Sequence, residues 1–148
     1  MPDANYRHTA LLCLLLGLAG CGGSNDDHSW MQGQWKSDVA TTKIANEAFF
    51  SEFSSDGVDI YLSMFGEVTW HLDGEQFSAI QPNGVVPPAR YSLTQRESNL
   101  VLTTANHAIL IIPATDKQSF CTKPLLEDSS EAFSDFVECY IKIDSDRE

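Results

Sequence analysis

The sequence predicts an all-β protein in which an antiparallel meander of about eight or nine strands closes into a barrel. Two observations indicate this fold class. Apolar residues recur at every second position along most of the chain, and short turns rich in glycine, asparagine, aspartate and proline separate these stretches. A two-sheet β-sandwich is the alternative because it would bury the same residues, but consecutive hairpins favour the barrel.

Each expected strand is a stretch of alternating apolar and polar residues. In one of them, Val58, Ile60, Leu62 and Met64 are the apolar members. After a first strand around Trp35, the expected strands cover residues 48–53, 58–64, 67–72, 75–81, 91–95, 100–104, 108–112 and 137–143.

Turn residues separate these strands. Asp73-Gly74 predicts a two-residue hairpin because both positions favour positive φ, and Ser55-Asp56-Gly57 predicts a similar turn. Pro87 and Pro88 lack a backbone donor, so they are expected outside any strand ladder. Residues 41–47 fit either a short helix or a loop.

One short C-terminal helix is expected before the last strand. Asp128 and Ser129 supply oxygen acceptors for the first helical amides, and Phe133 and Phe136 follow at helical spacing. The final strand, 137–143, is expected to place Cys139 on its apolar face, which suits a buried bridge.

The N-terminus has the layout of a secretory signal. A polar start containing Arg7 precedes an apolar run over residues 9–18, which is too short to cross a bilayer core of about 30 Å. Leu18-Ala19-Gly20-Cys21 then resembles the lipobox of bacterial lipoproteins. An ordinary secretory signal, or a membrane stub with a chance cysteine, is the alternative.

The lipobox resemblance implies cleavage before Cys21, a diacylglyceryl group on its thiol and palmitate-type acylation of the new amine. Gly22, rather than an aspartate, follows Cys21, which implies the outer membrane of the bacterial cell envelope, with the domain facing the periplasm. We therefore divide the chain into a signal peptide (1–20), a flexible tether (21–28) and a barrel domain (29–148).

Charge and cysteine content narrow the possible partners and the expected cross-links of the domain. The chain has 21 acidic and 9 basic residues, a formal net charge of −12, so an acidic surface would repel nucleic acid. Cys121 and Cys139 remain after the signal and the lipidated Cys21 are set aside. In an oxidising compartment we expect them to form a disulfide worth about 3 kcal/mol. Two buried thiols, or half of a metal site, are the alternatives.

Gly33-Gln34-Trp35 resembles the Gly-x-Trp signature of lipocalins and of smaller lipocalin-like bacterial lipoproteins. This resemblance implies a lipocalin-like barrel with Trp35 sealing its closed end. The family carries an arginine over that tryptophan on the last strand, where the nearest basic residue here is Lys142. The family's Thr-Asp-x-x-Tyr motif is not present.

No sequence pattern indicates catalysis. The chain has no Gly-x-Ser-x-Gly elbow, no His-Glu-x-x-His pair and no phosphate-binding glycine loop, so we expect no enzyme, no cofactor and no metal. A set of aromatic residues either lines an apolar cavity or fills the barrel, and filling is favoured because the domain is short for a lipocalin. These residues are Trp35, Phe49, Phe53, Tyr61, Trp70, Phe77 and Tyr91.

The sequence thus predicts a membrane-anchored, non-enzymatic binding or accessory module. Its expected partners are the membrane, through the lipid anchor, and either a small apolar ligand or an envelope protein bound at the open rim. An envelope lipoprotein with a structural or interaction role and no cavity is the alternative. A hydrolase whose site leaves no sequence signature comes third.

Overall fold

A computed structural model describes residues 27–64, 66–125 and 135–143. Nine antiparallel strands form one sheet in the order β4-β3-β2-β1-β9-β8-β7-β6-β5. The strands are β1 Gly33–Ser37, β2 Thr69–Leu72, β3 Gln76–Gln81, β4 Gly84–Arg90, β5 Ser92–Arg96, β6 Asn99–Thr103, β7 Ala108–Pro113, β8 Ser119–Leu125 and β9 Glu138–Ile143.

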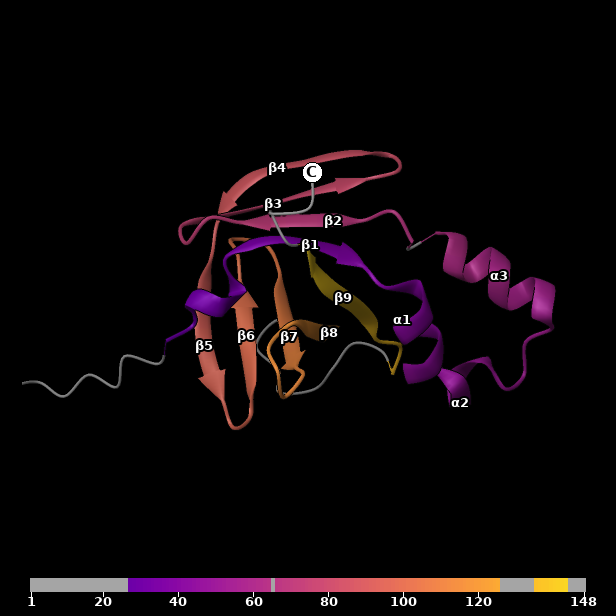
Figure 1. Cartoon of the computed structure of the whole chain (residues 1–148). Helices are drawn as coiled ribbons and strands as arrows, with labels where there is room; N and C mark the ends of the chain where they lie inside the picture. The colour runs from indigo at the N-terminus through magenta and orange to yellow at the C-terminus, as the bar shows by residue number, and fades with distance from the viewer. Residues whose placement is uncertain (1–26, 65, 126–134, 144–148) are drawn as a thin grey trace, which may run out of the picture.

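The sheet is a meander whose first and last strands also pair. Every other pair of neighbours is consecutive along the chain, and β1 pairs with β9 from Gln34↔Ile143 to Ser37↔Tyr140. The sheet curls into a nearly closed barrel whose edges are β4 and β5 (Figure 1). The predicted antiparallel barrel is therefore confirmed, and its shape is consistent with a lipocalin-like barrel.

Helices occupy two places around the sheet. A 3₁₀ turn, η1 (Ser29–Met31), precedes β1. Three short α-helices lie between β1 and β2: α1 Val39–Ala45, α2 Glu47–Phe50 and α3 Ser55–Ser63. Figure 1 shows α1–α3 at one side of the barrel and the start of the described chain at the opposite side.

The expected strands at 48–53 and 58–64 are wrong, as is the turn between them. The Ser54 side chain accepts a hydrogen bond from the Gly57 amide at 3.2 Å and caps α3. Val58 and Leu62, four residues apart, are buried, whereas Ile60 is exposed. An alternating run contains i, i+4 pairs as well as i, i+2 pairs, so the cap decides between strand and helix.

Residues 41–47, which fitted helix or loop, contribute to α1 and α2. Asp38 caps α1 by accepting a hydrogen bond from the Thr41 amide at 3.1 Å. The Asp73-Gly74 connection is longer than the predicted two residues, because β2 ends at Leu72 and β3 begins at Gln76. Gly74 alone in this turn has a positive φ, +99°.

Pro87 and Pro88 do lie within a strand, contrary to expectation. Their strand, β4, is an edge, and its register against β3 shifts between Phe77 and Ala79. A missing amide donor is tolerated at such an irregularity.

β8 was not predicted at all, because Thr122 alternates with Phe120 on its buried face and weakens the apolar pattern. The expected C-terminal helix at 128–134 lies outside the described residues.

The last strand forms as predicted, but its interior face is the opposite one. Tyr140 is buried in the barrel core, so Cys139, its neighbour on the strand, points outward. Cys139 is nevertheless buried, because α1 packs on that side of β9. Ile141, which shares the outer face, is partly exposed.

Candidate functional site

The barrel interior is filled by aromatic rings in mutual contact. Trp35 and Phe120 have ring centroids 4.7 Å apart, and Phe120 stacks on Tyr140 at 5.3 Å. Trp70 contacts Tyr140 at 4.5 Å and Phe77 at 5.0 Å. Rings at these separations leave no room for a ligand between them. Of the predicted cavity-lining residues, Trp35, Trp70 and Phe77 thus belong to a packed core.

Trp35 is a fully buried core residue that contacts η1. Its Nε1 donates to the Met31 carbonyl at 2.8 Å. The Lys142 ammonium lies 5.2 Å from the centroid of the Trp35 ring and donates to the Trp30 carbonyl at 2.9 Å. Lys142 therefore joins β9 to η1.

Two surface hollows lie beside η1. The larger, about 540 Å³, is lined mainly by residues in and beside η1 and β5, and His28, Gln32 and Tyr91 are the ones that flank these elements. The smaller, about 210 Å³, includes Trp30 and Lys117. Tyr91 packs at the margin of the core. His28 is the one histidine among the described residues that line the two hollows.

A second aromatic cluster forms under α2 and α3, separate from the barrel core. Phe49, Phe53 and Tyr61, all predicted as candidates, meet here: the Phe49 ring lies 5.4 Å from Phe53 and 5.5 Å from Tyr61. Phe50 and Phe136 complete the cluster. The predicted aromatic residues therefore divide between two sites and do not line a common cavity.

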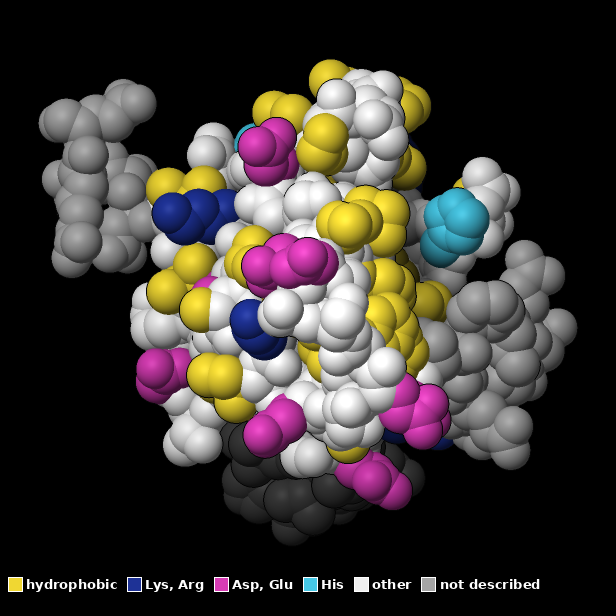
Figure 2. Space-filling model, turned by 90° about the vertical axis from the view of Figure 1, so that its right-hand side faces the viewer, with side chains coloured by type: hydrophobic (Ala, Val, Ile, Leu, Met, Phe, Trp, Pro, Cys, Tyr) yellow, Lys and Arg dark blue, Asp and Glu magenta, His cyan; other side chains and the backbone are white. Residues whose placement is uncertain are grey.

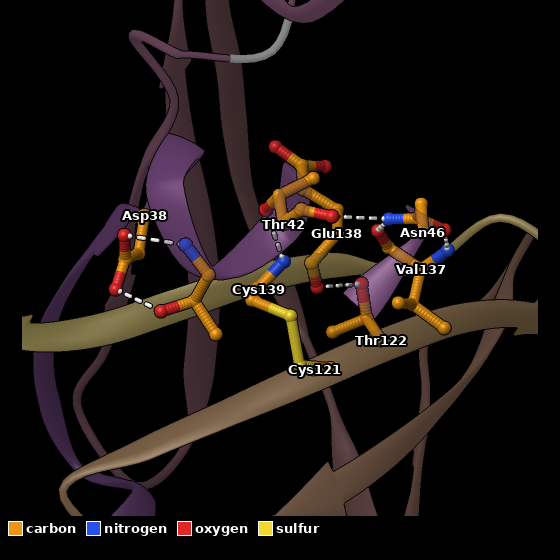
Figure 3. The surroundings of a disulfide bond; sticks show 9 residues. Asp38, Thr42, Asn46, Cys121, Thr122, Val137, Glu138 and Cys139 are labelled. Atoms are coloured by element: carbon orange, nitrogen blue, oxygen red, sulfur yellow. Dashed lines mark hydrogen bonds between the residues drawn. A yellow bond between two sulfur atoms is a disulfide. The ribbon is translucent and has the colours of Figure 1, made fainter. Parts of the chain in front are cut away.

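The segment 39–64, which we call the helical cap, is fastened to β9 through α1. Beyond the end of β1, α1 side chains replace a neighbouring strand (Figure 3). Asn46 donates to the Val137 carbonyl at 2.7 Å and accepts from the Val137 amide at 2.9 Å. Thr42 Oγ1 accepts from the Cys139 amide at 2.9 Å. Beyond the end of β1, the backbone of Val137 and the amide of Cys139 therefore find their hydrogen-bond partners on α1 and its C-cap residue instead of on a strand.

The predicted disulfide between Cys121 and Cys139 is present. The two residues are directly opposite each other on β8 and β9. Figure 3 shows the bridge joining the two strands beneath the residues of α1. The bridge therefore reinforces the same part of the sheet to which the helical cap is fastened. Cys21, the predicted lipidation site, lies outside the described residues.

The helical cap exposes most of the large apolar side chains found at the surface of the described residues. Nine such side chains are exposed, and six belong to the cap. We call these six the cap surface: Val39, Ile44, Phe49, Phe53, Ile60 and Met64. Figure 2 views the molecule from this side and shows apolar side chains gathered there with acidic groups around them. Exposed apolar side chains that gather on one part of a surface are typical of interaction sites.

Sequence reasoning missed Ile44, Ile60 and Met64 as surface residues. Ile60 and Met64 were assigned to a strand, in which they would share a buried face. The signal that distinguishes the two structures is Ser54 three residues before Gly57, an N-cap spacing. Once the helix is recognised, Val58 and Leu62 define its inner face and Ile60 falls on the outer one.

A partly buried carboxyl group lies where the helical cap meets the barrel. Ser37 Oγ donates to Glu138 Oε1 at 3.0 Å. Desolvation raises the pKa of Glu138, and hydrogen bonds from Tyr140 and Ser37 offset this only in part. Neither Ser37 nor Glu138 lines either of the two hollows, so the pair supports packing rather than substrate binding.

The described residues contain no group of three or more His, Cys, Asp or Glu side chains arranged to hold a metal ion. In the same part of the chain, no helix combines the length and apolar content needed to span a membrane. No protein family matches the sequence, and neither a curated protein nor a solved structure matches the chain.

Proposed function

We propose that this chain is a lipid-anchored, non-enzymatic protein of the bacterial envelope that acts by binding a partner protein through the cap surface. The observation that carries this proposal is the distribution of apolar side chains. Aromatic rings fill the barrel, whereas six large apolar residues of the cap remain exposed. Such exposure is unfavourable in water unless another surface covers it.

The resemblance of Leu18–Cys21 to a lipobox supports the anchor. The described chain begins at the side of the barrel opposite to α1–α3 (Figure 1). With a short tether ending at residue 28, the lipid would hold the η1 end near the membrane. The cap surface would then face the periplasm, where a partner can reach it.

The anchor is tested by metabolic labelling with palmitate and by the intact mass of the processed chain. We expect label on a chain that begins at Cys21, and its loss in Cys21→Ala. An unlabelled product, or one that begins at another residue, would refute the anchor and the envelope location together.

The partner-binding role is tested by photo-crosslinking in the native host. A photoreactive phenylalanine analogue replaces Ile60 in one strain and Thr94, exposed on β5 at the other side of the barrel, in a second. We expect one defined adduct with an envelope protein from position 60 only. Equal adducts from both positions, or none from position 60, would contradict the role.

A fatty-acid dye titration tests the apolar-ligand alternative. Because the core rings are in contact, we expect no saturable, lipid-displaceable fluorescence. A saturable response would instead favour a ligand cavity that opens on binding.

A further inference from the structure

An ion pair links the outer sides of α1 and α3. The Lys43 ammonium of α1 lies 3.8 Å from the Asp59 carboxylate of α3. Ile44 and Ile60 directly follow these two residues along the chain, and they are 75% and 68% exposed. The ion pair therefore links the two helices that carry these exposed isoleucines.

The exposed residues of α3 follow helical spacing. Ile60 and Met64 are four residues apart and so lie on one side, about 6 Å apart along the axis. Val58 and Leu62, also four apart, face the small core beneath. Ile60 and Met64 thus form an exposed apolar stripe about one turn long, and an i, i+4 pair of this kind is what a second amphipathic helix contacts.

Acidic residues predominate in the segment that carries this stripe. Residues 38–64 contain five carboxylates and a single basic residue, Lys43. The carboxylates are Asp38, Glu47, Glu52, Asp56 and Asp59. Asp56 lies one turn before Ile60 on the same side of α3. An occupant must therefore supply apolar side chains for the stripe and positive charge for its margin.

We propose that the cap surface receives a cationic amphipathic helix of a partner protein, with apolar residues at i, i+3 or i+4 and Lys or Arg beside them. This inference rests on the proposed function and specifies the partner's chemistry. A second copy of the chain fits poorly, because an isologous contact would bring two acidic margins together. Anionic lipid headgroups are disfavoured for the same reason.

The test uses the mature chain, residues 21–148, with Cys21→Ser so that no detergent is needed. The probe is a fluorescent 14-residue helix of leucine and lysine with an amphipathic arrangement. Two control peptides accompany it: one of the same composition in scrambled order, and one in which glutamate replaces lysine. Binding is followed by anisotropy, and the contact site is mapped by backbone amide chemical shifts.

We expect the amphipathic Leu/Lys helix to bind more tightly than both control peptides, with an affinity that falls as the salt concentration is raised. Its binding should change the amide chemical shifts of residues 39–64. Ile60→Ser removes an apolar contact and should weaken binding about tenfold. Ile80→Ser is the matched control, since Ile80 is the same residue type, 58% exposed, on β3. It should change the affinity by less than twofold.

Four results would overturn the inference: no binding, equal binding of the scrambled or glutamate peptide, an equal loss in Ile80→Ser, or shifts outside the cap. Concentration-dependent self-association that Ile60→Ser abolishes would assign the surface to a second copy instead. A cellular crosslink at position 60 without Leu/Lys binding would refute this inference alone, and a missing crosslink would refute the proposed function.

Discussion

At the residue scale, Glu138 is a largely buried carboxyl group through which pH should act on the stability of the fold. Desolvation raises its pKa in the folded state, so the folded protein holds this proton more tightly than the unfolded chain, whose carboxyl has an ordinary pKa near 4.5. Folding then takes up a proton above that pH, and the free energy of unfolding falls as pH rises towards the raised pKa.

Glu138→Gln tests this sign. The amide stays neutral, and its oxygen can still accept from Ser37 Oγ. We measure the free energy of unfolding in urea. We expect the difference between variant and wild type to shift in favour of the variant as pH rises above about 4.5, and to become constant above the raised pKa. Glu67→Gln, at an exposed position, controls for the change in net charge. A difference between Glu138→Gln and wild type that does not vary with pH would refute the assignment.

Lys142 is a second residue for which the structure assigns a specific stabilising role. Its ammonium lies over the Trp35 ring and donates to the Trp30 carbonyl. We expect Lys142→Met to lower the free energy of unfolding by about 1–2 kcal/mol, since it removes a cation–π contact and a charged hydrogen bond. Lys142→Arg should retain most of this. If Lys36→Met, at an exposed position on β1, lowers the free energy of unfolding equally, the loss comes from the removal of one positive charge and not from the contacts of Lys142.

At the element scale, Asn46 decides whether α1 can act as a neighbour of β9. Its side chain makes both long-range hydrogen bonds to Val137 and is itself buried. We expect Asn46→Ala to destabilise the fold by about 2–4 kcal/mol, because two buried backbone groups lose their partners. Chemical denaturation measures this loss, with Asn106→Ala in an exposed turn as the control. Similar midpoints for the two variants would refute the role of α1.

The elements also show what the sequence could predict. The β2–β3, β5–β6 and β6–β7 hairpins follow from alternation and turn residues, and they form, whereas β4 and β8 were not predicted as strands. The α2–α3 segment was misassigned because an alternating run such as Val58 to Met64 satisfies both periods. β9 was predicted, but not that its buried Cys139 faces away from the barrel. That burial depends on α1, a contact between residues nearly a hundred positions apart.

At the scale of the whole molecule, the candidate site was predicted only in its parts. The aromatic residues named from the sequence are structurally important, yet composition could not show that they divide into a barrel core and a cap cluster. Two burial patterns in one chain produce this division. The strands bury aromatic rings, among them Trp35 and Tyr140, in the barrel core. The short helices bury Phe50 against Val58 and Leu62 in the cap. The exposed cap surface is what remains once both cores have been packed.

A solid barrel makes a prediction that a hollow one would not. Phe120 is 1% exposed and contacts the rings of Trp35, Trp70 and Tyr140. Phe120→Ala should lower the free energy of unfolding by about 3–5 kcal/mol and leave an apolar void. Such voids stay dry and bind small apolar molecules, so added benzene should raise the melting temperature of the variant and not that of the wild type. Should Phe120→Ala fail to fold, Leu102→Ala, at another fully buried position, creates a smaller void for the same measurement. Saturable stabilisation of the wild type by benzene would show that the barrel already contains a cavity, and would return the apolar-ligand function to first place.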